Sequence, residues 1–223
     1  MQIEVQTMAN DLDLPRKRGM LITIEGIDGC GKSTQLQKIA TFLQSRQIPY
    51  HITCEPTKND IGQLLRKYLK QKTVPTIDAL LFAADRLDHC HREILPALQS
   101  NKLVISDRYV LSSIAYQSLQ CEELGVTTEW IATINQFCIV PDLIILLDLD
   151  PTIALQRRYN ETEMQNREKF EEITFQSRLR NRYLQLVEDR FNGWNYAVVD
   201  ASRNSDDVFA SIVKVFVTFL PKS

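Results

Sequence analysis

Three of the seven glycines in the chain fall within six residues, in the segment Gly26-Ile-Asp-Gly-Cys-Gly-Lys-Ser33. This segment matches the pattern G-x-x-x-x-G-K-[ST], in which glycines let backbone N–H groups turn inward around phosphate oxygens. The pattern predicts that Lys32 reaches the β- and γ-phosphates of a nucleoside triphosphate and that the Ser33 hydroxyl binds Mg²⁺. The alternative is a glycine-rich turn that binds nothing. The predicted triphosphate-binding residues are Gly26, Ile27, Asp28, Gly29, Cys30, Gly31, Lys32, Ser33 and Thr34.

Further polar residues follow other apolar, β-branched runs. Glu55 comes after the run at 50–54, and Asp107 and Arg108 come after the run at 103–106. The planar guanidinium of Arg108 suits a phosphate group, unless it pairs internally with Asp107. Asp107 is placed to hold Mg²⁺ through water, and its alternative role is to cap a helix.

Alternating strand and helix patterns must position these residues. Apolar runs predict five strands, and spacings of three and four residues predict the helices between them. This order predicts an α/β fold, a doubly wound five-stranded parallel sheet with helices on both faces, which binds ligands at the carboxyl ends of its strands. The predicted strands are 20–25, 50–54, 103–106, 143–147 and 197–199. A long helix is expected over 76–99, with an inner face of Leu80, Leu81, Ala84, Leu87 and Leu95.

Composition sets broad limits on the protein. The chain has 223 residues, 44% hydrophobic and 24% charged, with a net charge of −2, as in ordinary globular proteins. That charge argues against nucleic acid as a partner, and no apolar run is long enough for a membrane span. Five cysteines without a C-x-x-C pair predict reduced thiols and a cytoplasmic protein. We expect a disordered extension over 1–19 and a single domain over 20–223.

The class of nucleotide-binding protein can be narrowed by what the chain lacks. A GTPase needs an N-K-x-D motif to bind guanine, and the nearest segment, Thr57-Lys-Asn-Asp60, has the wrong order. A mechanical ATPase normally has partner domains or greater length. A compact phosphotransferase acting on a small acceptor is the remaining class.

Three segments together resemble the thymidylate kinase family. They are Asp107-Arg-Tyr-Val-Leu-Ser-Ser-Ile-Ala-Tyr-Gln117, Leu81-Phe-Ala-Ala-Asp-Arg86 and Glu55-Pro-Thr57, and the resemblance extends from Met20 to the C-terminus. The Glu-Pro-Thr form and the segment Asn166–Glu171 are similar to archaeal-type members. The resemblance implies a P-loop kinase fold with a lid, phosphorylation of dTMP to dTDP with ATP and Mg²⁺, and a homodimer.

The same resemblance implies roles for single residues. Phe82 would stack on thymine and Arg86 would bond the base edge, although the helical pattern alone favours a core role for Phe82. Their spacing, i and i+4, places both on one helix face. The other implied substrate-binding residues are Asp28, Glu55, Arg108, Ser113, Tyr116 and Gln117, with Tyr116 crowding a ribose 2′-hydroxyl. Arg203 matches the family's adenine-side loop.

Arginines flank a polar segment that predicts a lid over about 157–168. A lid would close over ATP and bring an arginine to the transferred phosphoryl group. The phosphate loop has no arginine of its own, so the candidates are Arg158 and Arg167. The alternative is a solvated surface loop. Three further arginines, at 178, 180 and 182, have a spacing that predicts a solvated helix face.

Two other functions compete with dTMP phosphorylation. In a deoxynucleoside kinase, Glu55 would be the general base that takes the proton of a 5′-hydroxyl. Against this, Asp107-Arg-Tyr109 replaces the Glu-Arg-Ser type of signature, and no Trp follows Glu55-Pro56. A non-catalytic nucleotide-binding regulator would bind ATP and release no ADP.

Overall fold

The computed structural model describes residues 19–71, 74–159 and 167–219, and it describes side chains in the last range from Glu172 onward. The predicted extension lies outside these residues except for Gly19, whose N–H donates to the Leu98 carbonyl oxygen at 2.8 Å. Residues 160–166, which form most of the predicted lid, also lie outside them.

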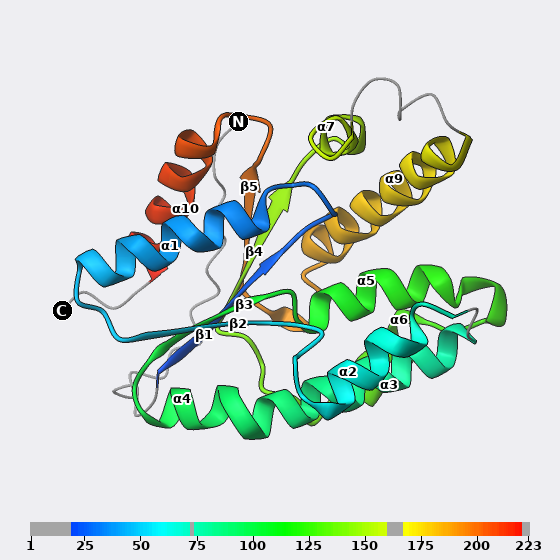
Figure 1. The fold of residues 1–223 in the computed structure, drawn as a ribbon, viewed down its shortest axis with the longest axis horizontal. Coiled ribbons are helices and arrows are strands. Elements are labelled where there is room, and N and C mark those ends of the chain that lie inside the picture. Colours follow the sequence, from blue (N-terminus) through cyan, green and yellow to red (C-terminus); the bar gives the residue numbers. More distant parts are fainter. Residues whose placement is uncertain (1–18, 72–73, 160–166, 220–223) are drawn as a thin grey trace.

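A five-stranded parallel sheet forms the centre of the molecule (Figure 1). Its spatial order is β2-β3-β1-β4-β5, with every neighbouring pair parallel. The residues of β1 and most of those of β4 are fully buried, because helices cover both faces of the sheet. The predicted sheet is confirmed. The strands are β1 (Met20–Glu25), β2 (Tyr50–Cys54), β3 (Leu103–Asp107), β4 (Leu143–Asp148) and β5 (Tyr196–Asp200).

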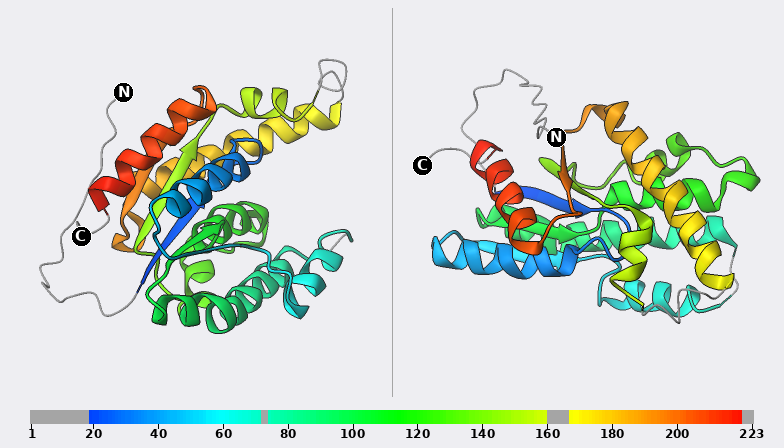
Figure 2. Two further views of the ribbon diagram at one scale, coloured as in Figure 1. Left: turned by 60° about the vertical axis from the view of Figure 1, so that its left-hand side comes forward. Right: turned by 90° about the horizontal axis from the view of Figure 1, so that it is seen from above.

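Helices cover the sheet in two layers (Figures 1 and 2). Helices α1 (Lys32–Ser45) and α10 (Ser205–Phe219) pack together on one face, and helices from the segment between β2 and β5 lie on the other. The latter include α4 (Leu95–Gln99), α5 (Val110–Gln120) and α9 (Arg167–Glu188). The remaining α-helices of the described residues are α2 (Asp60–Tyr68), α3 (Pro75–His89), α6 (Thr128–Ile134) and α7 (Pro151–Gln156).

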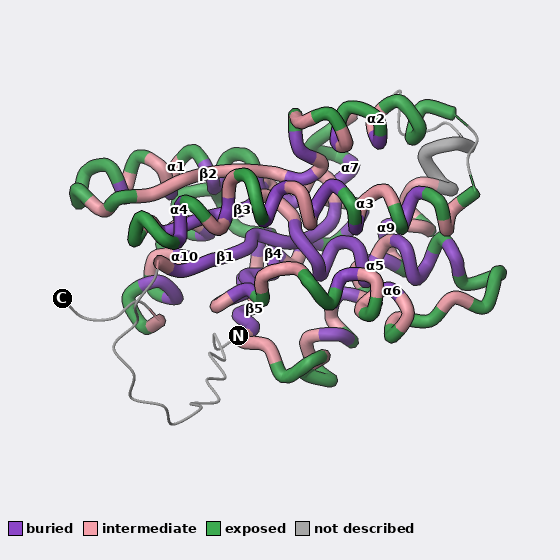
Figure 3. The backbone as a smooth tube through the Cα atoms, turned by 90° about the horizontal axis from the view of Figure 1, so that it is seen from below, coloured by how far each residue is buried: buried purple, intermediate pink, exposed green. Residues whose placement is uncertain are grey.

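The sheet and the helix faces turned toward it form one hydrophobic core (Figure 3). Leu21, Ile22 and Ile24 of β1 have no exposed surface, and Val104 and Ile105 of β3 are buried beside them. Because the strands themselves are largely apolar, the polar residues lie just after their carboxyl ends. This is the edge of the sheet where the sequence predicts ligand binding. Within the described residues, no helix combines the length and the apolar character needed to cross a membrane.

The long helix predicted over 76–99 is present, but it is not uniform and its predicted inner face is wrong. A π-helical turn at Cys90–Ile94 joins α3 to α4. Leu80 is 50% exposed and Ala84 is also exposed. The buried face of α3 instead carries Asp78, Ala79, Ala83, Asp85, Arg86 and His89. Apolar spacing misses this face because its polar side chains are buried with partners.

The prediction that the arginines of α9 form a solvated face holds for Arg178, which is exposed and pairs with Glu122, but it is wrong for Arg180 and Arg182. Arg180 donates from Nε and Nη2 to the Asp148 carboxylate, at 2.6 and 2.9 Å, at the end of β4. Arg182 donates to the Ser118 hydroxyl of α5 at 2.8 Å. These bonds fasten α9 to the sheet and to α5. Their partners come from distant segments, so residue spacing could not indicate them.

Candidate active site

The phosphate loop connects β1 to α1 and requires glycine at its first position. Gly26 has a φ of 139°, and a Cβ atom there would lie 2.6 Å from the Leu147 carbonyl oxygen. Lys32 begins α1 and is only 8% exposed. Its Nζ donates to the carbonyl oxygens of Gly26 and Ile27, both at 3.0 Å. The ammonium group is therefore held inside the curve of the loop.

A cavity of about 520 Å³, here called the loop cavity, opens beside this segment. Its wall carries the cations Lys32, Arg66, Arg108, Arg157 and Arg158 and the acids Asp28, Glu55 and Asp107. Ser33 and Thr34 also line it. A concave wall with more cations than acids favours a polyanion.

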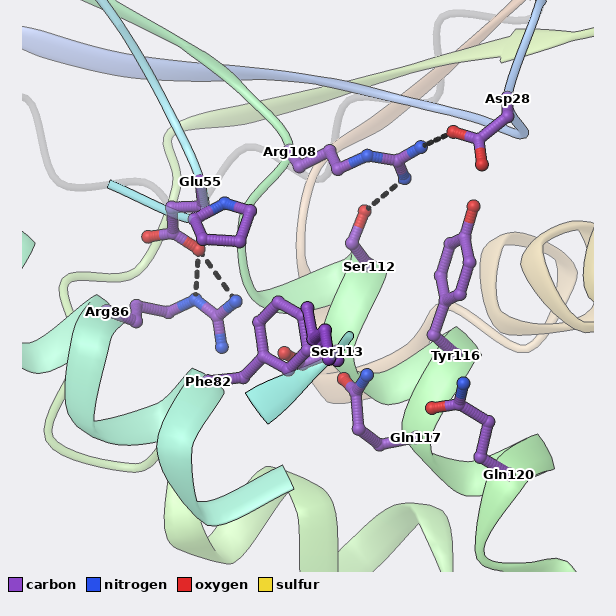
Figure 4. Close-up of a pocket in the computed structure, with 12 residues that line it drawn as sticks. Asp28, Glu55, Phe82, Arg86, Arg108, Ser112, Ser113, Tyr116, Gln117 and Gln120 are labelled. Atoms are coloured by element: carbon purple, nitrogen blue, oxygen red, sulfur yellow. Dashed lines mark hydrogen bonds and ion pairs between the residues drawn. The ribbon is translucent and has the colours of Figure 1, made fainter. Parts of the chain in front are cut away.

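A second cavity of about 250 Å³, here called the aromatic cavity, lies between α3 and α5 (Figure 4). Every residue that the family resemblance assigned to substrate binding lines it. Phe82 is half-buried with its ring at this wall, so it is not a core residue. The predicted set is Asp28, Glu55, Phe82, Arg86, Arg108, Ser113, Tyr116 and Gln117, and Leu69, Ser112 and Gln120 also contribute.

The two cavities share part of their wall. Asp28, Glu55, Pro56 and Arg108 line both of them. These residues come from the phosphate loop and from the ends of β2 and β3, which neighbour one another at the carboxyl edge of the sheet. A group bound in one cavity would therefore lie next to a group bound in the other.

Arg108 is held at this shared wall by partners on several sides. Its guanidinium pairs with Asp28, and its Nη1 donates to the Ser112 hydroxyl at 3.1 Å and to the Gly26 carbonyl oxygen at 3.3 Å (Figure 4). It also lies 5.1 Å from the centre of the Tyr116 ring. The acid that pairs with Arg108 is thus Asp28. The sequence left open an internal pair between Arg108 and Asp107, and the structure does not contain that pair.

Asp107 has no helix-capping role, because α5 begins at Val110 and its N-cap residue is Tyr109. The Oδ1 atom of Asp107 is buried without a hydrogen-bond partner. Its carboxylate lines the loop cavity together with Ser33. An unsatisfied carboxylate oxygen and a hydroxyl are ligands that a hard cation such as Mg²⁺ prefers, so these residues fit that ion.

A buried polar network fixes Arg86 at the aromatic cavity. Arg86 is 1% exposed, and its Nε donates to Glu55 Oε2 at 2.8 Å. Its Nη1 donates to Asn135 Oδ1 at 2.6 Å. His89 Nδ1 lies 3.0 Å from Glu55 Oε1. Although burial disfavours the charged imidazole, the hydrogen bond and charge of Glu55 raise the pKa of His89 above its ordinary value.

The three arginines predicted for the lid and the adenine side, Arg158, Arg167 and Arg203, are placed differently from one another. Arg158 lines the loop cavity and donates to Glu172 Oε1 at 2.6 Å. Arg203 is half-exposed beyond β5, where it pairs with Asp200 at 3.4 Å, and it does not line the loop cavity. Arg167 begins α9, and its side chain lies outside the described residues.

The comparisons with known proteins agree with this geometry. A model of the thymidylate kinase family matches residues 24–212. The chain belongs to the thymidylate kinase family. A probable thymidylate kinase of Staphylothermus marinus is 36% identical over 208 residues, covering 93% of this chain and 99% of that protein. One from Pyrobaculum calidifontis is 40% identical, covering 88% and 95%. A thymidylate kinase of Carboxydothermus hydrogenoformans is 36% identical, covering 87% and 95%.

These relatives are mostly archaeal, in agreement with the archaeal-type features of the sequence.

Two cations of the loop cavity were not among the predicted site residues. Arg66 of α2 donates to the carbonyl oxygens of Pro56 and Thr57, and Arg157 donates to that of Ala201 at 3.1 Å. The sequence does contain one indication of this contact, which is the glycine at position 62, one helical turn before Arg66. A Cβ atom at Gly62 would lie 2.1 Å from the Thr57 carbonyl oxygen, so the glycine lets α2 approach the segment that Arg66 binds.

Proposed function

We propose that this chain transfers the γ-phosphoryl group of ATP to the 5′-phosphate of dTMP, giving dTDP. The observation that carries this proposal is the shared wall of the loop cavity and the aromatic cavity. A phosphate acceptor is already ionised, so the reaction needs no strong general base. It needs two polyanions brought into line and their charge neutralised, which positioning and electrostatics provide.

The loop cavity binds the triphosphate. The loop amides from Gly26 to Thr34 surround its oxygens, and the Lys32 ammonium exchanges its two carbonyl partners for the β- and γ-phosphates. Ser33 and Asp107 hold Mg²⁺, which when bound neutralises charge on the phosphates. Arg158 and Arg167 are the candidate arginines for the transferred phosphoryl group, and Arg203 lies on the adenine side.

The aromatic cavity binds the thymine nucleotide. Phe82 stacks on the base, Arg86 bonds its edge, and Arg108 binds its phosphate. Three polar atoms of α5 support this assignment, because each is buried without a hydrogen-bond partner in a residue that lines the cavity. Buried polar atoms are normally satisfied, so a polar ligand is expected at these positions. They are Ser113 Oγ, Tyr116 Oη and Gln117 Oε1.

A deoxynucleoside kinase is not favoured. That function would require a free oxygen of Glu55 to accept the proton of a 5′-hydroxyl. Both oxygens are already engaged, Oε2 by Arg86 and Oε1 by His89. Glu55 is therefore suited to holding Arg86 in place.

An ADP-release assay with MgATP and a panel of acceptors tests the proposal. We expect rapid ADP release with dTMP and none above background with thymidine or without an acceptor. The variant Lys32→Ala controls for a contaminating kinase, and its turnover should fall by about a thousandfold, because it lacks the cation that reaches the transferred phosphate. Release with thymidine but not dTMP would favour the deoxynucleoside kinase, and ATP binding without any release would favour the regulator.

We also propose that the protein acts as a homodimer in the cytoplasm. The support for a dimer is an exposed apolar face on α3, where Ile77 is 42% and Leu80 is 50% exposed. The support for the compartment is that all five cysteines are free thiols, as in a reducing environment.

A further inference from the structure

Glu25 is the last residue of β1, the strand that leads into the phosphate loop, and its carboxyl group is buried. The residue has no exposed surface. Its Oε2 accepts a hydrogen bond from the Ser112 hydroxyl at 2.5 Å, and its Oε1 is buried without a hydrogen-bond partner. A buried carboxyl group that is only half satisfied costs stability, so a functional reason for its presence is needed.

Ser112 connects Glu25 to the residue that binds the acceptor phosphate. A serine hydroxyl has one hydrogen to donate and two lone pairs with which to accept. Here the hydrogen goes to Glu25, while Arg108 Nη1 donates to the oxygen at 3.1 Å and the Tyr183 hydroxyl lies 2.8 Å away, placed to donate as well. The hydroxyl has no further capacity. Glu25 therefore sets the orientation of the Ser112 hydroxyl, and the position of the Arg108 guanidinium depends on that orientation.

We propose that Glu25 is a positioning residue for phosphoryl transfer, which acts through Ser112 to hold the Arg108 guanidinium at the wall between the two cavities. This inference rests on the proposed function, because it requires the dTMP phosphate to bind Arg108. Tyr183 of α9 belongs to the same hydrogen-bond network, because its hydroxyl contacts the Ser112 hydroxyl.

The charges around Arg108 explain why a second acid is useful. Asp28 pairs with the guanidinium from the open side, where its side chain is 46% exposed. An incoming phosphate competes with Asp28 for the same donors. Glu25 lies on the closed side, where no ligand can displace it, so it retains Arg108 when the phosphate binds. Burial raises the pKa of Glu25 to about 7, while Ser112 and Arg108 oppose this by favouring its charged form.

The experiment measures KM for each substrate in the variant Glu25→Gln, whose amide keeps the shape of the side chain and removes its charge. We expect KM for dTMP to rise about tenfold, the usual effect of weakening a charged hydrogen bond, with KM for ATP within about twofold. Ser112→Ala should act in the same direction. Thr23→Val, an equally buried change two residues earlier on β1, is the matched control and should leave both KM values unchanged.

A double variant separates positioning from general damage to the fold. If Glu25 acts through Arg108, Glu25→Gln should have no further effect on dTMP binding in an Arg108→Ala background, as measured by calorimetry. Penalties that add, or equal changes in both KM values, would overturn the inference while leaving the proposed function in place. Wild-type protein that neither binds nor phosphorylates dTMP would overturn the proposed function, and this inference with it.

Discussion

Arg108 adopts a left-handed backbone conformation, with a φ of 66°, which is uncommon for a residue that carries a side chain. Its N–H donates to the Ile24 carbonyl oxygen at 3.0 Å, which ties this conformation to the central strand β1. Strained backbone of this kind is found where the surrounding structure enforces it, and active sites are common examples. In this chain the strain places a guanidinium at the wall between two cavities.

Glu25 gives a prediction about stability and pH. Its pKa is raised from 4.5 to about 7 in the folded state, so the folded protein holds this proton more tightly than the unfolded chain. The contribution of this carboxyl group to the free energy of unfolding is therefore greatest below about pH 4.5, and it is lost as the pH rises through 7. The groups that face it are Ser112, Arg108, Arg86, Glu55, Tyr183 and Tyr196.

Glu25→Gln should consequently be more stable than the wild type at pH 8, by up to about 3 kcal/mol. The difference should shrink by roughly 2 kcal/mol at pH 5, since the wild-type carboxyl group is then protonated. Urea unfolding at the two pH values measures this, with Thr23→Val as the control. A variant that is less stable than the wild type at pH 8 would show that the buried charge supports the fold.

Tyr116 gives a prediction about the sugar. Its ring is packed by Phe175 and Tyr183, with ring centres 6.1 and 6.4 Å away, so it cannot easily move aside for a larger ligand. We expect Tyr116→Ala to reduce the preference of kcat/KM for the deoxynucleotide over the ribonucleotide by about tenfold, because the ring no longer excludes the 2′-hydroxyl. An unchanged ratio would remove the steric role of Tyr116.

The sequence predicted the residues of the phosphate loop and the aromatic cavity but not those that hold them. Lys32, Ser33 and Arg108 carry their own signals, because a short motif or a strand end predicts their chemistry. Glu25 and Arg66 carry weaker ones, since the role of Glu25 depends on Ser112 at a distant position of the chain and that of Arg66 on the carbonyl oxygens of Pro56 and Thr57 in the loop before its helix. Such partners become visible only when the elements are packed.

At the scale of elements, α3 presents opposite faces to two different environments. One face carries Asp85, Arg86 and His89, buried in polar contacts, and the other carries Ile77 and Leu80, which are exposed. The apolar pattern predicted a helix here and placed its core on the wrong side. The apolar spacing of α3 thus detected the exposed surface that carries Leu80 and not the core. The proposed dimer would bury that surface.

This arrangement predicts the effect of a charge on the exposed face. Leu80→Arg should convert the dimer to a monomer, because a dimer interface cannot bury an unpaired guanidinium without a cost of several kcal/mol. Light scattering at micromolar concentration would measure the mass. Leu124→Arg, a change at a residue that is 57% exposed in the segment after α5, is the control and should not alter it. A wild-type mass of one chain would contradict the dimer.

At the scale of the whole molecule, the sequence was sufficient to predict the architecture. Five apolar runs separated by helices leave few arrangements for a parallel sheet, and the predicted strands lie within two residues of the observed ones. The π-helical turn at Cys90–Ile94 was not predicted, because its extra residue leaves the apolar spacing of a long helix almost unchanged. The side chains of 167–171 and the segment 160–166 lie outside the described residues, so the lid remains a prediction.

The wall formed by Asp28, Glu55, Pro56 and Arg108 belongs to both cavities. A nucleotide on one side therefore changes the electrostatic potential experienced by a nucleotide on the other. Thermodynamic linkage requires that the factor by which ATP alters the affinity for dTMP equals the factor by which dTMP alters the affinity for ATP. On the proposed assignment of ATP and dTMP to the two cavities, the two substrates are coupled ligands, and each acts as an effector of the other.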